Sequence, residues 1–141
     1  MRNFAVAPMK NIRVGIVGCG ARGSGAVQRL PKVPGVEVTA VCDVRREYLD
    51  RAVDAIAGAT KHRPRAFGTA ADAWKGLCDW DGVDVVYNAM PWHLHAPVAV
   101  YAMRAGKHAF VEVPSAMFVD ECWELVETAE KTKRHCMQLE N

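Results

Sequence analysis

Long apolar runs are missing from this sequence, and no stretch approaches the ~20 consecutive apolar residues that a membrane-spanning helix needs. An excess of charge of one sign is missing too, because 18 basic residues stand against 16 acidic ones and the net charge is only +2. The densest basic run, residues 131–135, lies where a helix should end, so we interpret it as a solvated helix terminus. We therefore expect neither a membrane nor a nucleic acid as a partner.

Paired cysteines are also missing. The five cysteines are Cys19, Cys42, Cys78, Cys122 and Cys136. Their number is odd, no two have C-x-x-C spacing, and most have apolar neighbours, so a disulfide framework or a zinc site is not expected. The first ten residues contain neither a secretory apolar stretch nor twin arginines. We interpret the cysteines as reduced core residues and expect a cytoplasmic location.

What the sequence does contain describes one globular domain. Hydrophobic residues make up 50% of the 141 residues and charged residues 24%, with no low-complexity tract. A chain of this length has room for a single domain. Regular periodicity begins only after residue 10, so we expect residues 1–10 to be a flexible leader and residues 11–141 to form the domain.

Short apolar, β-branched runs alternate with longer segments of helical periodicity. The predicted strands are residues 12–17, 36–42, 65–67, 83–89, 108–113 and 136–139. The predicted helices are residues 23–30, 46–57, 70–77, 95–105 and 120–132. This alternation favours parallel strands whose crossover helices cover both faces. We predict an α/β fold with a doubly wound, parallel, six-stranded sheet, which is the Rossmann architecture.

A glycine motif follows the first predicted strand. Gly18, Gly20 and Gly23 form G-x-G-x-x-G between that strand and a helix. The first glycine permits a tight turn, the second lets a pyrophosphate approach the backbone, and the third lets helix and strand pack closely. The free amides and positive end of the helix then favour phosphates. A tight turn in any α/β protein would use the same spacing, so the motif needs its context.

That context is an acidic residue at the end of the second strand. Asp43 follows Gly23 by twenty positions, where a carboxylate accepts hydrogen bonds from the adenosine ribose hydroxyls. A carboxylate there also repels a 2′-phosphate, which favours NAD over NADP. Arg45 and Arg46 follow closely and partly oppose that preference. The sequence therefore predicts a dinucleotide-binding domain with NAD as its cofactor.

The loop after the fourth strand should line the cofactor, because the carboxyl ends of parallel strands face the ligand crevice. Its residues are Trp92, His93, Leu94 and His95. A metal pair of the two histidines is the alternative, but two imidazoles without a carboxylate or thiolate nearby make a poor site. A role in packing alone is the other alternative for Trp92 and the histidines. We predict cofactor contacts and no metal site.

Two further polar groups fall at the same edge of the sheet. Glu112 stands near the end of the fifth strand, where it either contacts the cofactor or solvates the edge. Asn141, at the end of the sixth strand, has an amide able to bind a nicotinamide carboxamide.

Several of these segments resemble the amino-terminal half of the Gfo/Idh/MocA oxidoreductases. They are the strand ending in Asp43, residues 91–95, residues 105–108 and the edge Glu112-Val113-Pro114. Most dehydrogenases of that family have a catalytic lysine where Val113 stands. That departure, together with residues 111–116, 121–126 and 134–141, resembles glycoside hydrolase family 109, which includes NAD-dependent α-N-acetylgalactosaminidases. The similarity runs from about residue 12 to residue 141 and is most specific in the last thirty positions.

The resemblance implies a set of NAD contacts and a mechanism. The contacts are Ala21, Arg22, Asp43, Trp92, His93, Leu94, His95, Glu112, Val113 and Asn141. The implied reaction is glycoside hydrolysis, in which NAD takes hydride from C3 of the sugar, the aglycone leaves by elimination, water adds and the hydride returns. A carboxyl-terminal domain, expected to be absent here, would supply the sugar pocket and the acid and base, so we assign no catalytic residue to this chain. Phe118 departs from relatives that tend to have a helix-capping hydroxyl at this position.

Three functions remain open from the sequence. The first is the cofactor domain of such a glycosidase, which binds NAD but does not turn over sugar alone. The second is the cofactor domain of a sugar or inositol dehydrogenase. The third is a non-catalytic dinucleotide-binding or interaction module, in which apolar surface supports association, including a homo-oligomer.

Overall fold

Parallel strands and crossover helices alternate along the chain in the computed structural model, which describes residues 5–140. The strands are β1 (Ile12–Val17), β2 (Val36–Asp43), β3 (Arg65–Gly68), β4 (Val85–Asn88), β5 (His108–Val111) and β6 (Cys136–Gln138). The α-helices are α1 (Ala21–Arg29), α2 (Arg46–Ala59), α3 (Ala73–Asp79), α4 (His95–Arg104) and α5 (Val119–Thr132). Two short 3-10 helices, η1 (Leu30–Lys32) and η2 (Trp92–Leu94), complete the order.

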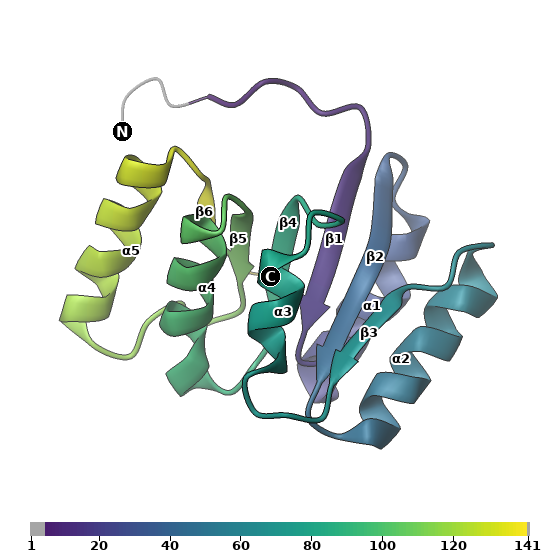
Figure 1. Cartoon of the computed structure of the whole chain (residues 1–141). Helices are drawn as coiled ribbons and strands as arrows, with labels where there is room; N and C mark the ends of the chain where they lie inside the picture. The colour runs from purple at the N-terminus through teal and green to yellow at the C-terminus, as the bar shows by residue number, and fades with distance from the viewer. Residues whose placement is uncertain (1–4, 141) are drawn as a thin grey trace.

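The strands form one six-stranded sheet in the order β3-β2-β1-β4-β5-β6, and every pairing is parallel. Figure 1 shows the helices on both sides of this sheet, with α3, α4 and α5 on one side and α1 and α2 on the other. The predicted doubly wound parallel fold is confirmed. The order reverses between β1 and β4, which is the switch point where such sheets bind ligands.

The core explains why the strands are apolar on both faces. Ile16 and Val17 are neighbours in β1, and both are fully buried. Ile16 packs in a cluster with Ala26 and Ile56 of α1 and α2, whereas Val17 packs with Leu77 and other residues of α3 and α4. Parallel sheets covered on both faces produce such continuous apolar runs. A third cluster joins α4, β5 and α5.

Some predicted boundaries at the ligand edge were wrong by one to three residues. β2 extends to Asp43, because this residue still pairs with Gly68 of β3. β5 ends at Val111, whose carbonyl accepts a hydrogen bond of 2.8 Å from Leu139, so residues 112 and 113 follow the strand instead of ending it. α3 begins at Ala73, three residues after the predicted start.

The cysteines lie mostly in the core, as expected. Cys19, Cys42 and Cys78 are buried and unpaired, and burial raises the pKa of each thiol to about 12. Their thiols therefore stay protonated and unreactive near neutral pH. Cys136 is half-buried, and Cys122 is exposed on α5.

Helix α5 begins without a capping hydroxyl at Phe118. The carboxylate oxygen Oε2 of Glu121 accepts hydrogen bonds from the backbone N–H of Met117, at 2.7 Å, and of Phe118, at 3.2 Å. The Glu121 carboxylate thus holds the backbone that leads into the helix and also suits the positive end of the helix. Phe118 has no side-chain acceptor, so no side chain at this position caps the amides of the first turn.

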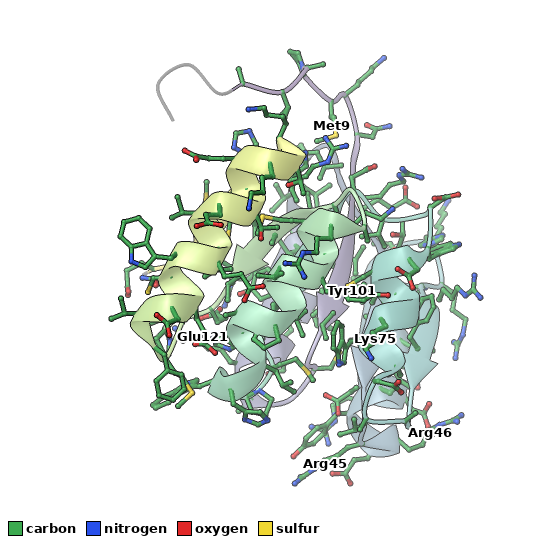
Figure 2. All side chains as sticks on the ribbon, turned by 60° about the vertical axis from the view of Figure 1, so that its left-hand side comes forward. Met9, Arg45, Arg46, Lys75, Tyr101 and Glu121 are labelled. Atoms are coloured by element: carbon green, nitrogen blue, oxygen red, sulfur yellow. The ribbon has the colours of Figure 1, made fainter. Side chains whose placement is uncertain are left out.

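Residues 5–10 lie at the opposite end of the sheet from the ligand edge (Figure 2). Residues 5–10 contain neither helix nor strand. Figure 2 shows Met9 at one end of the molecule and Arg45 and Arg46, which follow β2, at the other. Within residues 5–140, no helix combines the length and the apolar character needed to cross a membrane.

Candidate functional site

The glycine loop has the geometry that a bound pyrophosphate requires. Gly18 has φ +85°, and a Cβ there would lie 2.6 Å from the carbonyl oxygen of Ala89. A Cβ on Gly23 would lie 1.7 Å from the carbonyl oxygen of Gly18, so only glycine allows α1 to approach the loop. A Cβ on Gly20 would meet nothing closer than the Tyr48 ring at 3.5 Å. The first and third glycines are thus required by the fold, whereas the space at Gly20 is free for a ligand.

Asp43 is held in place by two backbone amides. Its Oδ2 accepts a hydrogen bond of 2.7 Å from the N–H of Cys19, and its Oδ1 accepts one of 2.8 Å from the N–H of Arg45. The residue is only 7% exposed. Each carboxylate oxygen retains a second lone pair. The carboxylate is therefore oriented before a ligand arrives and can still accept two hydroxyl groups.

A cleft of about 470 Å³ runs along the carboxyl edge of the sheet between the glycine loop and the loop after β4. The predicted contacts that line it are Gly18, Gly20, Ala21, Arg22, Asp43, Trp92, His93 and Leu94. The sequence analysis did not predict Tyr48 and Ala71, which also line it. The guanidinium carbon of Arg45 lies 5.2 Å from the centre of the Tyr48 ring, and its Nη1 donates to the Tyr48 hydroxyl at 3.1 Å. These two side chains form the wall beside Asp43.

The loop after β4 is fixed by Asn88, which is almost completely buried. Its Nδ2 donates to the carbonyl oxygens of Leu94, at 3.2 Å, and His95, at 3.1 Å. Its Oδ1 accepts a hydrogen bond of 3.1 Å from the N–H of Met90. One side chain thus closes the loop that carries Trp92, which is 61% exposed at the cleft. Such exposure does not fit a role of Trp92 in packing alone.

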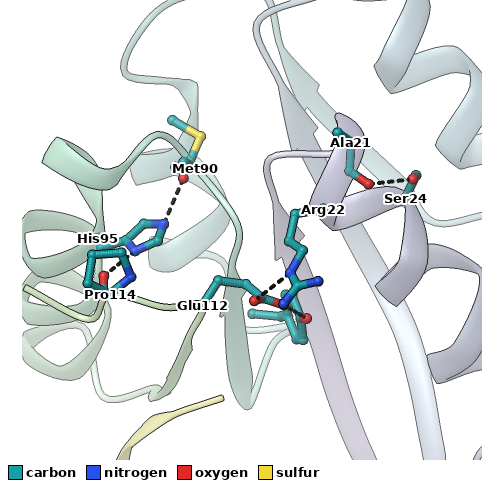
Figure 3. Close-up of polar contacts among 8 residues, drawn as sticks. Ala21, Arg22, Ser24, Met90, His95, Glu112 and Pro114 are labelled. Carbon is teal, nitrogen blue, oxygen red and sulfur yellow. Dashed lines mark hydrogen bonds and ion pairs between the residues drawn. The ribbon is translucent and has the colours of Figure 1, made fainter. Parts of the chain in front are cut away.

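His95 has a different position from its neighbours. It is 2% exposed, and its two ring nitrogens lie 2.6 Å from the carbonyl oxygen of Pro114 and 2.7 Å from that of Met90 (Figure 3). The imidazole therefore joins the loop after β4 to the loop after β5. It does not line the cleft, so any effect on a cofactor passes through these two loops.

Glu112 is buried at the carboxyl end of β5 and binds two side chains from other elements. Its Oε2 accepts a hydrogen bond of 2.9 Å from Nε of Arg22, and its Oε1 accepts one from the hydroxyl of Tyr87. Burial alone would raise the pKa of Glu112, but the hydrogen bonds from Tyr87 and Arg22 and the charges of Arg22 and Arg29 outweigh burial, and the net pKa is lowered. Burial, followed by the hydrogen bond to the carboxylate, raises the pKa of Tyr87 to about 12. The lowered pKa of Glu112 and the raised pKa of Tyr87 agree on an ionised Glu112 beside a neutral Tyr87.

Of the remaining predicted contacts, Val113 and Gly23 lie outside the lining of the cleft. Val113 is 40% exposed and precedes the cis peptide bond to Pro114. Gly23 is buried behind the loop. Asn141 lies outside the described residues. Within residues 5–140, no group of three or more His, Cys, Asp or Glu side chains is arranged to hold a metal ion.

The residues present fit a dinucleotide. The open space at Gly20 lies at the amino end of α1, where free amides and the positive end of the helix dipole favour a pyrophosphate. Asp43 lies in the same cleft, with lone pairs free for ribose hydroxyls. The sequence analysis missed Tyr87, whose phenol looked like an ordinary strand residue, and the stacking of Arg45 on Tyr48.

Comparison with known proteins gives the same assignment. A family model described as "Oxidoreductase family, NAD-binding Rossmann fold" matches residues 12–139. A glycosyl hydrolase family 109 protein of Porphyromonas gingivalis is 44% identical over 133 residues, which cover 94% of this chain and 28% of that protein. An α-N-acetylgalactosaminidase of Bacteroides fragilis is 43% identical over 138 residues, covering 98% of this chain and 32% of that protein. The chain thus spans about a third or less of the length of these curated relatives.

A solved structure has the same fold. The WlbA dehydrogenase of Chromobacterium violaceum, solved with NADH and UDP-GlcNAcA, superposes with a TM-score of 0.81 at 25% identity. The match covers 95% of this chain and 37% of the dehydrogenase.

Proposed function

Because this chain belongs to the Gfo/Idh/MocA oxidoreductase family as an NAD-binding Rossmann domain, we propose that it is the cofactor domain of an enzyme that hydrolyses glycosides with NAD as a recycled cofactor. The observation that carries the proposal is the identity of 43% to 46% with glycosyl hydrolase family 109 proteins over nearly the whole chain. Val113 supports the same choice, because the family resemblance places it where most dehydrogenases have their catalytic lysine.

The residues of the cleft divide the binding of NAD among them. The amides at the start of α1 and the space at Gly20 hold the pyrophosphate, and Asp43 accepts from the adenosine ribose. Trp92 and Leu94 close the side of the cleft toward β4. When bound, NAD supplies a reversible hydride acceptor, so that no net oxidation results.

Glu112 and His95 are buried and neither lines the cleft, so we do not assign the proton transfers of such a reaction to them. The Glu112 carboxylate binds Arg22 and Tyr87. The ring nitrogens of His95 lie within hydrogen-bond distance of the carbonyl oxygens of Pro114 and Met90. We propose that the acid, the base and the sugar pocket belong to a further domain, and that this chain binds NAD without hydrolysing a sugar by itself.

We also propose a preference for NAD over NADP. Asp43 would repel a 2′-phosphate, because its carboxylate is ordered at the cleft. Arg46 pairs with Asp50 at 2.9 Å on the exposed face of α2 and does not line the cleft. Arg45 lines the cleft and keeps donors besides the one bound to Tyr48, so the preference for NAD depends on Asp43.

The test is a calorimetric titration of the chain with NAD and with NADP, beside Asp43→Ala. The matched control is Asp54→Ala, because Asp54 is an exposed carboxylate on α2 with a single arginine partner. We expect NAD to bind to the wild type and the control, and to bind at least tenfold more weakly to Asp43→Ala. No binding of NAD by the wild type would overturn the proposal.

A dehydrogenase cofactor domain is the second candidate, and the similarity to the WlbA dehydrogenase favours it. The two candidates differ in net redox change. With an aryl α-N-acetylgalactosaminide and NAD, a full-length protein carrying this domain should release the aglycone without accumulating NADH. Stoichiometric NADH formation from a sugar or polyol would favour the dehydrogenase.

An interaction module is the third candidate, from a different class. Phe118, Val119 and Trp123 of the α5 region are each more than 60% exposed. Apolar surface of this kind supports association, including a homo-oligomer. Light scattering that gives a monomer over a wide concentration range would count against it.

The buried free thiols fit our further proposal of a cytoplasmic location.

A further inference from the structure

Three side chains from different elements meet behind the glycine loop. Arg22 stands in the first turn of α1, Tyr87 in β4 and Glu112 directly after β5. Arg22 and Tyr87 each bind one carboxylate oxygen of Glu112, so neither oxygen of this carboxylate is left without a donor. Figure 3 shows Arg22 and Glu112 pointing toward each other.

Glu112 and its partner Arg22 differ in exposure. The side chain of Glu112 is 9% exposed, whereas that of Arg22 is 57% exposed and lines the cleft. The bond to Glu112 uses Nε of Arg22. The guanidinium therefore keeps its Nη groups for an anion in the cleft, and this planar group binds phosphates well through two donors.

The charge of Glu112 favours an ion pair with Arg22 over a contact with the pyrophosphate. Glu112 is ionised, because the hydrogen bonds and positive charges around it outweigh its burial. An ionised carboxylate near a pyrophosphate would repel it if the two were in contact. The pairing with Arg22 neutralises that charge and uses it to hold the arginine.

We propose that Glu112 and Tyr87 are positioning residues that hold the guanidinium of Arg22 against the pyrophosphate of the dinucleotide. Glu112 then acts on the cofactor through Arg22 and not by direct contact. Tyr87 fixes the carboxylate from the far side and thereby fixes the angle at which Arg22 enters the cleft. This inference rests on the proposed NAD-binding function and assigns a role to a residue that the sequence analysis missed.

The test is a double-mutant cycle read as the Kd for NAD. We expect Glu112→Gln and Tyr87→Phe each to weaken NAD binding about three- to tenfold, and Arg22→Gln about tenfold or more, as for loss of a charge-assisted hydrogen bond. In the Arg22→Gln background, Glu112→Gln should cause no further loss, because its partner has gone. Additive losses would overturn the proposal.

A second ligand separates positioning from direct contact. ADP has the pyrophosphate of NAD but neither the nicotinamide nor its ribose. If Glu112 acts through Arg22, Glu112→Gln weakens ADP and NAD binding by the same factor. If Glu112 contacts the nicotinamide-ribose half directly, only NAD binding weakens, and the proposal is wrong.

The chain offers matched controls for the tyrosine and glutamate variants. Tyr101→Phe removes a hydroxyl that donates to Asp79 at 3.0 Å, and Glu124→Gln breaks an ion pair with Arg104 of 3.1 Å. Both pairs are remote from the lining of the cleft, and both variants should bind NAD as the wild type does. Tyr87→Phe loses only one hydroxyl, so it keeps the inference testable if a charged variant fails to fold. Failure of the wild type to bind NAD and ADP would instead reject the proposed function.

Discussion

The carboxylate of Asp43, at the end of β2, accepts a hydrogen bond of 2.7 Å from the backbone N–H of Cys19, in the middle of the glycine loop. The residue expected to recognise the ribose is thus also the residue that holds the phosphate loop in place. A second amide, that of Arg45, binds the other carboxylate oxygen. Ligand recognition and loop stability therefore depend on the same side chain.

This double role predicts that Asp43→Ala lowers stability as well as NAD affinity. The substitution leaves the buried N–H of Cys19 without its acceptor, which costs about 1–3 kcal/mol in the free energy of unfolding. Urea denaturation without ligand measures this cost. Asp54→Ala, on exposed surface, should stay within about 0.5 kcal/mol of the wild type. An unchanged urea midpoint for Asp43→Ala would mean that the hydrogen bond does not stabilise the loop.

Substitutions at two glycines of the loop should separate binding from folding. Gly23→Ala places a Cβ against the Gly18 carbonyl oxygen, so we expect it to destabilise the domain. Gly20→Ala meets only ordinary contacts with Tyr48, so we expect a folded protein whose pyrophosphate site is blocked. Gly58→Ala is the control, because its Cβ meets nothing within 4 Å in α2, and it should stabilise by up to about 1 kcal/mol.

Thermal unfolding and NAD titration of these three variants check the order. If Gly20→Ala binds NAD as tightly as the wild type, the pyrophosphate does not lie over this residue. If Gly23→Ala melts with the wild type, α1 can move away from the loop more easily than its packing indicates.

His95 should stabilise the cleft without contacting the cofactor. The imidazole donates to at least one of the carbonyl oxygens of Met90 and Pro114, and His95→Phe leaves that oxygen without its buried donor, at a cost of about 1–3 kcal/mol. His93→Phe is the control, because His93 is exposed and the change should stay within about 0.5 kcal/mol. Denaturation midpoints of the two variants give the comparison, and equal midpoints would contradict the role assigned to His95.

The sequence was sufficient for the fold and for the half of the site that is local in the chain. The G-x-G-x-x-G spacing identifies Gly18, Gly20 and Gly23, and the position after an apolar strand identifies Asp43. The fold follows from the same alternation, because a strand buried on both faces needs crossover helices on both faces.

The part of the site that the sequence did not reveal depends on contacts between elements that are distant in the chain. Tyr87 lies in an apolar run, where a phenol predicts packing, and its partner Glu112 is 25 positions away. Arg22 reaches the same carboxylate across 90 positions. Whether these three side chains meet depends on which strand faces α1 and on where β5 ends. The predicted end of β5 was two residues too late. For His95, the sequence indicated the loop correctly but not that both ring nitrogens bind backbone carbonyls.

The stability of the domain should also fall between neutral and mildly acidic pH because of His108. Burial and the nearby charges of Arg134 and His135 lower the pKa of His108 below its ordinary value of 6.5. Its Nδ1 accepts a hydrogen bond of 2.9 Å from the N–H of His135, which requires that this nitrogen carry no proton. Below pH 6.5, His108 therefore binds a proton in the unfolded chain but not in the folded chain. The contribution of His108 to the free energy of unfolding is complete above pH 6.5 and is lost as the pH falls from 6.5 toward the lowered pKa. Urea midpoints measured from pH 7.5 to 5.5 should decrease for the wild type and decrease less for His108→Asn, which has no titrating ring. An identical decrease in both proteins would assign the pH dependence to another group.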